Sequence, residues 1–205
     1  MKKTITILLA VAMVATLFCG VAAADKFDMG VQDGNTYWNE TFSIGCTLDE
    51  NWYFLSMEEI YGIKDITKEQ LEGEMAEMLE QGSTAIVAYA QNMENGATMN
   101  ITMERLSITN AVLVTEKSYI ELSVDGLKEA LSQMGLENIK TEIVEEDFCG
   151  EKHAAMNIYG TINGMDFFEK MIAVKDGRNV SIVTIGSVNE DHTADILDCF
   201  TAEKP

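Results

Sequence analysis

Four cysteines, two histidines and 34 acidic residues are the side chains in this chain that could do chemistry. A zinc site or a nucleophilic active site needs several of them at fixed spacings, such as Cys-x-x-Cys or two histidines one helical turn apart. His153 and His192 have no His, Cys or Asp at such a spacing, and no catalytic signature surrounds any cysteine. The sequence therefore predicts no catalytic, cofactor-binding or metal-binding residue, and both histidines are expected to be polar surface residues.

The three cysteines beyond the first 24 residues have different expected surroundings. Cys46 shares the alternation of Phe42 and Ile44 and should face the core, whereas Cys199 lies on the apolar side of a predicted final helix. Cys149 lies in a predicted turn and should be the most exposed of the three. Two interpretations remain open: buried free thiols, or a disulfide between Cys46 and Cys199.

Carboxylates are clustered at Glu145-Glu146-Asp147 and near Asp25, Asp28 and Asp33. Acid–base catalysis needs one carboxyl whose pKa is shifted inside a pocket, and clusters arise readily in so acidic a chain. Residues 28–35 lack the Asp-x-Asp-x-Asp-Gly order of a calcium loop. Weak calcium binding by the exterior remains an alternative to a simply solvated surface.

The first 24 residues have the composition of a secretory signal peptide. Lys2 and Lys3 precede a stretch without charge that ends in the small residues 22–24, so cleavage is expected before Asp25. Two alternatives are an uncleaved anchor and a lipoprotein modified at Cys19. The sequence thus predicts a secreted or cell-envelope protein outside the cytoplasm.

The net charge of −20 limits the partners of the exported part. Loss of Lys2 and Lys3 makes it still more negative, and such a surface repels nucleic acid and anionic lipid headgroups. No second apolar run is long enough to span a membrane. Residues 25–36 are expected to form a flexible leader, and residues 37–205 a single domain.

Most of that domain shows the alternation of half-buried strands. Strands are predicted near residues 42–48, 52–54, 84–91 and 97–106, the first two as a hairpin. A four-strand antiparallel meander follows at 139–144, 153–162, 165–174 and 179–186. Asn163-Gly164 and Asp176-Gly177 are its expected tight turns, because both central positions of such turns need positive φ.

Helices are predicted between these strands. Capping boxes at Ser56 and Thr67 indicate two helix starts, and apolar stripes indicate helices over 115–134 and 189–200. The expected fold class is α+β: a mainly antiparallel central sheet with helices on its faces and a C-terminal four-strand meander.

The opening of the domain resembles small exported domains of the PsbP and DcrB families. Phe42, Ile44, Leu48 and Trp52 match an F-x-I/V-x-x-x-L-P-x-x-W hairpin, with Asp49 where the family usually has Pro. The resemblance implies an α/β/α sandwich and an accessory or binding role, and it carries no catalytic residue across.

Three functions are compatible with these patterns. The first is a secreted or envelope-associated, non-catalytic binding or accessory protein, with an unknown protein or small molecule as partner and no cofactor. The second is a carrier of a small apolar ligand in a cleft lined by Met75, Met99 and Met103. The third is a hydrolase that uses acidic residues.

Overall fold

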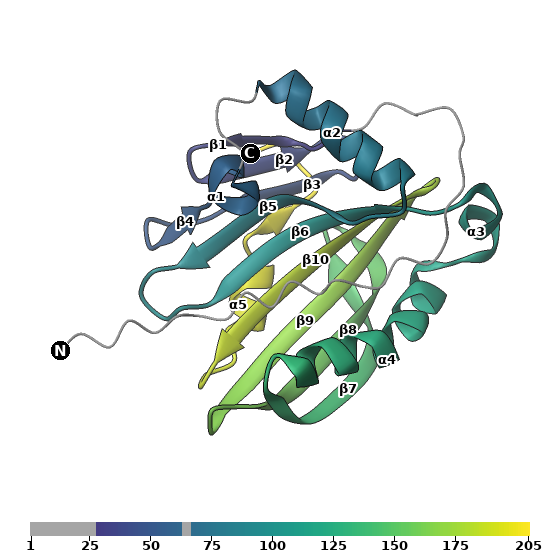
Figure 1. Ribbon diagram of the computed structural model, residues 1–205. Helices are drawn as coiled ribbons and strands as arrows, with labels where there is room; N and C mark the ends of the chain where they lie inside the picture. Colours follow the sequence, from purple (N-terminus) through teal and green to yellow (C-terminus); the bar gives the residue numbers. More distant parts are fainter. Residues whose placement is uncertain (1–27, 63–66) are drawn as a thin grey trace.

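A seven-stranded antiparallel sheet, in the order β4-β5-β6-β10-β9-β8-β7, is the centre of the fold (Figure 1). The computed structural model describes residues 28–62 and 67–205, so the predicted signal peptide and Cys19 lie outside the described residues. The strands are β4 (Trp52–Phe54), β5 (Ala85–Asn92), β6 (Thr98–Arg105), β7 (Leu136–Phe148), β8 (Glu151–Ile162), β9 (Met165–Asp176) and β10 (Asn179–Val188).

The predicted C-terminal meander is confirmed. Strands β7 to β10 pair antiparallel in chain order, and β10 then pairs with β6 to join the two halves of the sheet. Asn163 and Gly164 form a two-residue turn with φ of 53° and 78°. The last turn, however, is Gly177-Arg178 and not Asp176-Gly177, because Asp176 pairs with Asn179 as part of the ladder. Gly177 there has the positive φ, at 56°.

A second, four-stranded sheet was not expected from the sequence. It consists of β1 (Val31–Asp33), β2 (Thr36–Asn39), β3 (Ile44–Thr47) and β11 (Phe200–Thr201), in the order β1-β2-β3-β11. Within the stretch expected as a leader, Val31–Asp33 pair with β2, and Met29 is buried. Strand pairing and burial therefore fix the described part of that stretch to the sheet.

The predicted hairpin between 42–48 and 52–54 is wrong. Strand β3 pairs with β2 and β11, whereas β4 pairs with β5 in the large sheet. The link between them turns at Asp49, whose carboxylate accepts a hydrogen bond from the Asn51 N–H at 2.8 Å. The chain thus crosses from one sheet to the other at this corner.

Five helices lie in the described residues: α1 (Met57–Tyr61), α2 (Lys68–Glu80), α3 (Ile108–Leu113), α4 (Glu116–Gln133) and α5 (Thr193–Leu197). The capping boxes at Ser56 and Thr67 are confirmed, and Thr115 caps α4 in the same way. Helix α3 was not predicted. The final helix is shorter than expected, because Phe200 pairs with Cys46 in β11.

The two faces of the large sheet are covered by different layers. Leu71, Met75 and Leu79 of α2 belong to one core, which also includes β2 and β3 of the small sheet. Ile120 and Leu127 of α4 belong to the other core. In β10, Val183 faces the first core and Ile182 the second, as alternation along a strand requires. The fold is therefore α+β, with helices on both faces of the sheet.

No helix in the described part of the chain is long and apolar enough to cross a bilayer. Met75, Met99 and Met103 are at most 2 % exposed and belong to the core between α2 and the sheet. Their role is to fill that core.

Glu169 places a carboxyl group inside the sheet. Its side chain lies in β9, is 3 % exposed, and its Oε1 has no hydrogen-bond partner among the described residues. Its register partner on β10 is Gly186, which has no side chain to offer. Burial raises the pKa of Glu169 to about 8.

Substitution of the turn glycines tests the meander. Gly164→Val and Gly177→Val should each lower the free energy of unfolding by about 1 kcal/mol or more, because a β-branched residue is strained at positive φ. A Cβ at either position would have no atom within 4 Å, so the loss of stability comes from backbone strain and not from a steric clash. Urea denaturation measures it, with Asn163→Gly as the tolerated control at the same turn. An unchanged unfolding free energy in both valine variants would contradict the turn assignment.

Glu169→Gln tests the buried carboxyl. Folded Glu169 keeps a proton that the unfolded chain loses near its ordinary pKa of 4.5. This contribution to stability is complete below about pH 4.5 and is lost as the pH rises to about 8, by at most about 1.4 kcal/mol per pH unit. The variant should therefore gain stability relative to the original protein between about pH 5 and about pH 8. Urea unfolding at both pH values measures this. If the free energies of unfolding of the variant and the original protein differ by the same amount at both pH values, the prediction is refuted.

Candidate functional site

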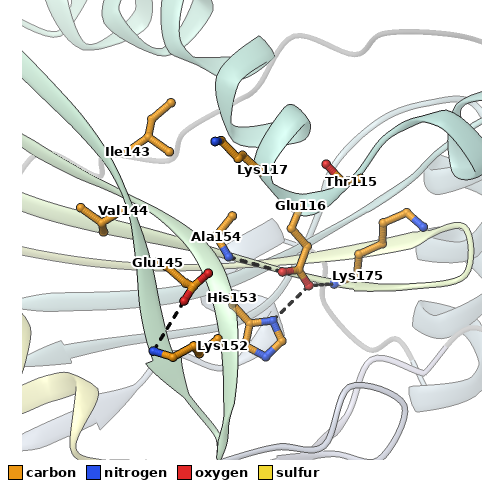
Figure 2. A pocket seen from close by; sticks show the side chains of 10 residues that line it. All are labelled: Thr115, Glu116, Lys117, Ile143, Val144, Glu145, Lys152, His153, Ala154 and Lys175. Atoms are coloured by element: carbon orange, nitrogen blue, oxygen red, sulfur yellow. Dashed lines mark hydrogen bonds and ion pairs between the residues drawn. The ribbon is translucent and has the colours of Figure 1, made fainter.

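A pocket of about 600 Å³ opens where the N-terminus of α4 meets strands β7, β8 and β9 (Figure 2). Its walls come from four separate segments of the chain. The lining residues are Thr115, Glu116, Lys117, Ile143, Val144, Glu145, Lys152, His153, Ala154 and Lys175.

Glu116, in the first turn of α4, makes hydrogen bonds to residues on two of the strands that line this pocket. Its Oε1 accepts hydrogen bonds from the Lys175 backbone N–H at 2.9 Å and from His153 Nδ1 at 3.0 Å. Its Oε2 accepts a longer one from the Ala154 N–H at 3.4 Å. The carboxylate therefore ties the start of α4 to both β8 and β9.

The pKa of Glu116 reflects two opposing effects. Burial is the largest single influence and on its own would raise the pKa. The hydrogen bonds from His153 and from the Lys175 and Ala154 N–H groups, together with the charge of His153, outweigh it and hold the pKa below its ordinary value. Glu116 is thus an ionised carboxylate at neutral pH.

His153 is oriented by this carboxylate. Because an ionised carboxylate only accepts hydrogen bonds, Nδ1 must carry the proton, which leaves Nε2 as the group that can act toward a ligand. The edge of the ring also packs against Phe148, with centroids 6.2 Å apart. The side chain is only 11 % exposed, so it is not the surface histidine expected from the sequence.

Lysines surround the pocket but contribute differently. Lys152 is paired with Asp147 at 3.1 Å and with Glu145 at 3.6 Å. Lys175 contributes its backbone N–H, and Figure 2 shows its side chain pointing away from His153. The side chain of Lys117 is 73 % exposed, and its pair with Glu121 is 4.0 Å long. Such an exposed pair holds a side chain weakly, so Lys117 is available to a ligand.

The lining residues differ in the groups that they leave free for chemistry. In a mechanism of the Ser-His or Cys-His type, a free hydroxyl or thiol lies beside the histidine. Thr115 carries the one hydroxyl among the described lining residues, and it accepts the Ser118 N–H at 3.2 Å as the cap of α4. What the pocket offers instead is an oriented imidazole, an ammonium group and an apolar wall at Ile143 and Val144.

Most of the other residues considered in the sequence lie outside this pocket. His192 precedes α5, with its ring nitrogens 3.9 Å from Glu190 and 3.7 Å from Asp195. Within the described residues, no three His, Cys, Asp or Glu side chains are grouped so that they could hold a metal. In the acidic run on β7, Glu145 and Asp147 pair with Lys152, and Glu146 pairs with Lys170.

Nothing in the sequence identified Glu116, because its partners are distant along the chain. His153 follows it by 37 residues, and the Lys175 N–H follows by 59. The one local signal was the helix start that Thr115 caps, which places Glu116 in the first turn. An acidic residue there is ordinary, since it complements the helix dipole.

Comparisons with known proteins leave the family open. No family model matches the chain, and no curated protein matches it. The resemblance to the PsbP and DcrB families therefore stays a prediction. Among solved structures the chain is similar to LpqN of Mycobacterium tuberculosis, described as involved in cell envelope biogenesis. The match has a TM-score of 0.41 and 10 % identity over 76 % of each chain, and a likeness this weak supports no statement about fold or function.

Proposed function

We propose that this chain is an exported or envelope-associated binding protein, without catalysis of its own, whose ligand site is the pocket at the start of α4. The observation that carries the proposal is the fixed Glu116–His153 pair in the lining of a pocket to which Lys117 also contributes (Figure 2). Export is the part of the proposal that rests on the sequence of the first 24 residues.

The free groups of the pocket indicate the chemistry of the ligand. The carboxylates of Glu116 and Glu145 already have partners, whereas Lys117 and Nε2 of His153 remain for a ligand. An ammonium group donates three hydrogen bonds, and a protonated imidazole donates from both nitrogens. Ile143 and Val144 add apolar surface beside them. We infer a small ligand with an anionic group and a short apolar part.

The acidic exterior acts on such a ligand from a distance. A net charge of −20 repels anions, but at an ionic strength of about 0.1 M charges more than about 10 Å away are largely screened. Binding should then depend on the groups inside the pocket. This favours a small anion over an extended anionic polymer, which would meet the acidic surface around the pocket.

The two alternative functions have less support. A carrier with a cleft lined by Met75, Met99 and Met103 would need these side chains to face a cavity, and all three lie in the core. A hydrolase that uses acidic residues needs a raised carboxyl pKa in the pocket. Glu116 has a lowered pKa, and the carboxyls of Glu104 and Glu169, whose pKa is raised by burial, are not lining residues.

Titration with simple anions tests the binding site. Hexanoate, acetate and inorganic phosphate are added to the ¹⁵N-labelled protein that begins at Asp25, and amide shifts are followed by NMR. Hexanoate should bind more tightly than acetate, because its chain can cover Ile143 and Val144. Saturable shifts should centre on 115–117, 143–145 and 152–154.

Matched variants separate the pocket from the rest of the surface. Lys117→Ala and His153→Gln should each weaken hexanoate binding by about tenfold, the effect of losing one charged hydrogen bond. His192→Gln changes the other histidine, which is not a lining residue, and should bind as the original protein does. If no anion binds saturably, or if all three variants bind alike, the proposal fails.

The non-catalytic part of the proposal has its own test. Because no metal-ligating group of three was found among the described residues, elemental analysis of the purified protein should show no stoichiometric metal. One zinc ion per chain, removed together with activity by a chelator, would instead indicate a metalloenzyme. Mass spectrometry of species that copurify from the native envelope would identify the natural ligand.

A further inference from the structure

Three cysteines that are far apart in the sequence approach one another beside the small sheet. Cys46 lies in β3, and its register partner across the ladder is Phe200 of β11. Cys199 directly precedes Phe200, and its carbonyl accepts the Thr47 N–H at 3.1 Å. Cys46 and Cys199 therefore lie diagonally across this ladder, since Phe200 pairs with Cys46 and the Cys199 carbonyl accepts the N–H of Thr47.

Cys149 approaches the same place from the turn between β7 and β8. Its thiol is hydrogen-bonded to the backbone of Gly45, the residue before Cys46. Phe148, which precedes Cys149, and Phe200, which follows Cys199, are in contact, with tilted rings whose centroids are 5.1 Å apart. The meander, the small sheet and the C-terminal segment thus bring their cysteines to one junction.

The three thiols differ in solvent exposure. Cys46 is fully buried, whereas Cys149 and Cys199 are half-buried and pack against the same core. The pKa of Cys46 is raised by burial, and further by the neighbouring thiols of Cys199 and Cys149. Burial raises the pKa of Cys149 to about 11. All three are free thiols in this structure. Because their pKa values are raised, they are protonated and weakly nucleophilic in the folded protein.

The backbone separation of Cys46 and Cys199 suits a disulfide. Paired residues in an antiparallel ladder have Cα atoms about 5 Å apart across the ladder. Consecutive Cα atoms are about 3.8 Å apart along the chain, roughly at right angles to that direction. The two Cα atoms are therefore roughly 6 Å apart, inside the range that disulfides span. Cys199 precedes the first residue of β11, and its thiol donates a hydrogen bond to the Asp195 carbonyl at 3.6 Å, a weak contact that must be given up when the side chain rotates toward Cys46.

We propose that Cys46 and Cys199 form a disulfide in the exported protein and that Cys149 remains a free thiol. The bond would attach the two-residue strand β11, and with it the C-terminus, covalently to β3. The proposal rests on export for its setting, since disulfides persist in oxidising compartments. It does not depend on the ligand site.

The oxidation is a thiol–disulfide exchange with an external disulfide as oxidant. The Cys199 thiolate attacks one sulfur of that disulfide and releases the other as a thiolate, which gives a mixed disulfide. The Cys46 thiolate then attacks Sγ of Cys199 and expels the second thiolate of the oxidant. Two protons and two electrons pass to the oxidant, which becomes two thiols. In the folded protein, burial keeps the thiols protonated, whereas in the unfolded chain they are exposed and form thiolates more readily. The reaction should therefore be fast during folding and slow afterwards.

Refolding in a glutathione mixture tests the bond. The reduced protein that begins at Asp25 is refolded with excess oxidised glutathione, alkylated with iodoacetamide and digested for mass spectrometry. We expect one alkylated cysteine, Cys149, and a peptide pair joined through Cys46 and Cys199, about 2 Da lighter than its reduced parts. The oxidised protein should melt on the order of 10 °C above the reduced one, because the bond closes a long loop.

Two serine variants at half-buried positions provide the controls. Cys149→Ser should form the same disulfide and keep the melting shift, whereas Cys199→Ser should form no intramolecular disulfide and lose the shift. Three alkylated cysteines in the refolded protein, a bond that includes Cys149, or unchanged oxidation in Cys199→Ser would overturn the proposal. Hexanoate binding by Cys199→Ser should match that of the original protein, so this failure is distinguishable from failure of the ligand site.

Discussion

The fold depends on the burial of both faces of strand β10. Every residue from Val180 to Ser187 is buried, so the sheet must be covered on each side. Helix α4 covers one face, and α2 with the small sheet covers the other. A sheet with two apolar faces cannot be stable as a single layer in water, because the uncovered face would remain exposed. The placement of α4 on one side of the sheet, and of α2 with the small sheet on the other, meets this requirement.

The candidate site forms where one of these covering layers is attached. Helix α4 lies across β7, β8 and β9, and its first turn lies where the pairing of β8 with β9 ends, at Ala154 and Ala173, so that backbone N–H groups there need other partners. Glu116 meets that need by accepting backbone N–H groups of Lys175 and Ala154, and in doing so it orients His153. The same carboxylate therefore fixes the start of the helix and orients the imidazole that lines the pocket.

On the opposite face of the large sheet, few contacts hold the C-terminal segment to the small sheet near the three thiols. Strand β11 has only two residues, so few ladder hydrogen bonds hold the C-terminal segment to β3. The tilted rings of Phe148 and Phe200 add a contact between this segment and the long β7–β8 hairpin. Aromatic pairs of this kind stabilise by about 1 kcal/mol beyond the area that they bury. A covalent link at this junction would therefore add to a small set of non-covalent contacts.

The sequence by itself determined the elements whose signals are local. Capping boxes at Ser56 and Thr67, the stripe of α4 and the turn at Asn163-Gly164 are contacts within a few residues, and each was predicted at its observed place. Only the tertiary structure decided how β3 and β4 are divided between two sheets, where β11 pairs, and that Glu116 meets His153. Those outcomes depend on contacts between residues tens of positions apart. Alternation indicates that a strand has two faces, but it does not specify the neighbour that either edge will pair with.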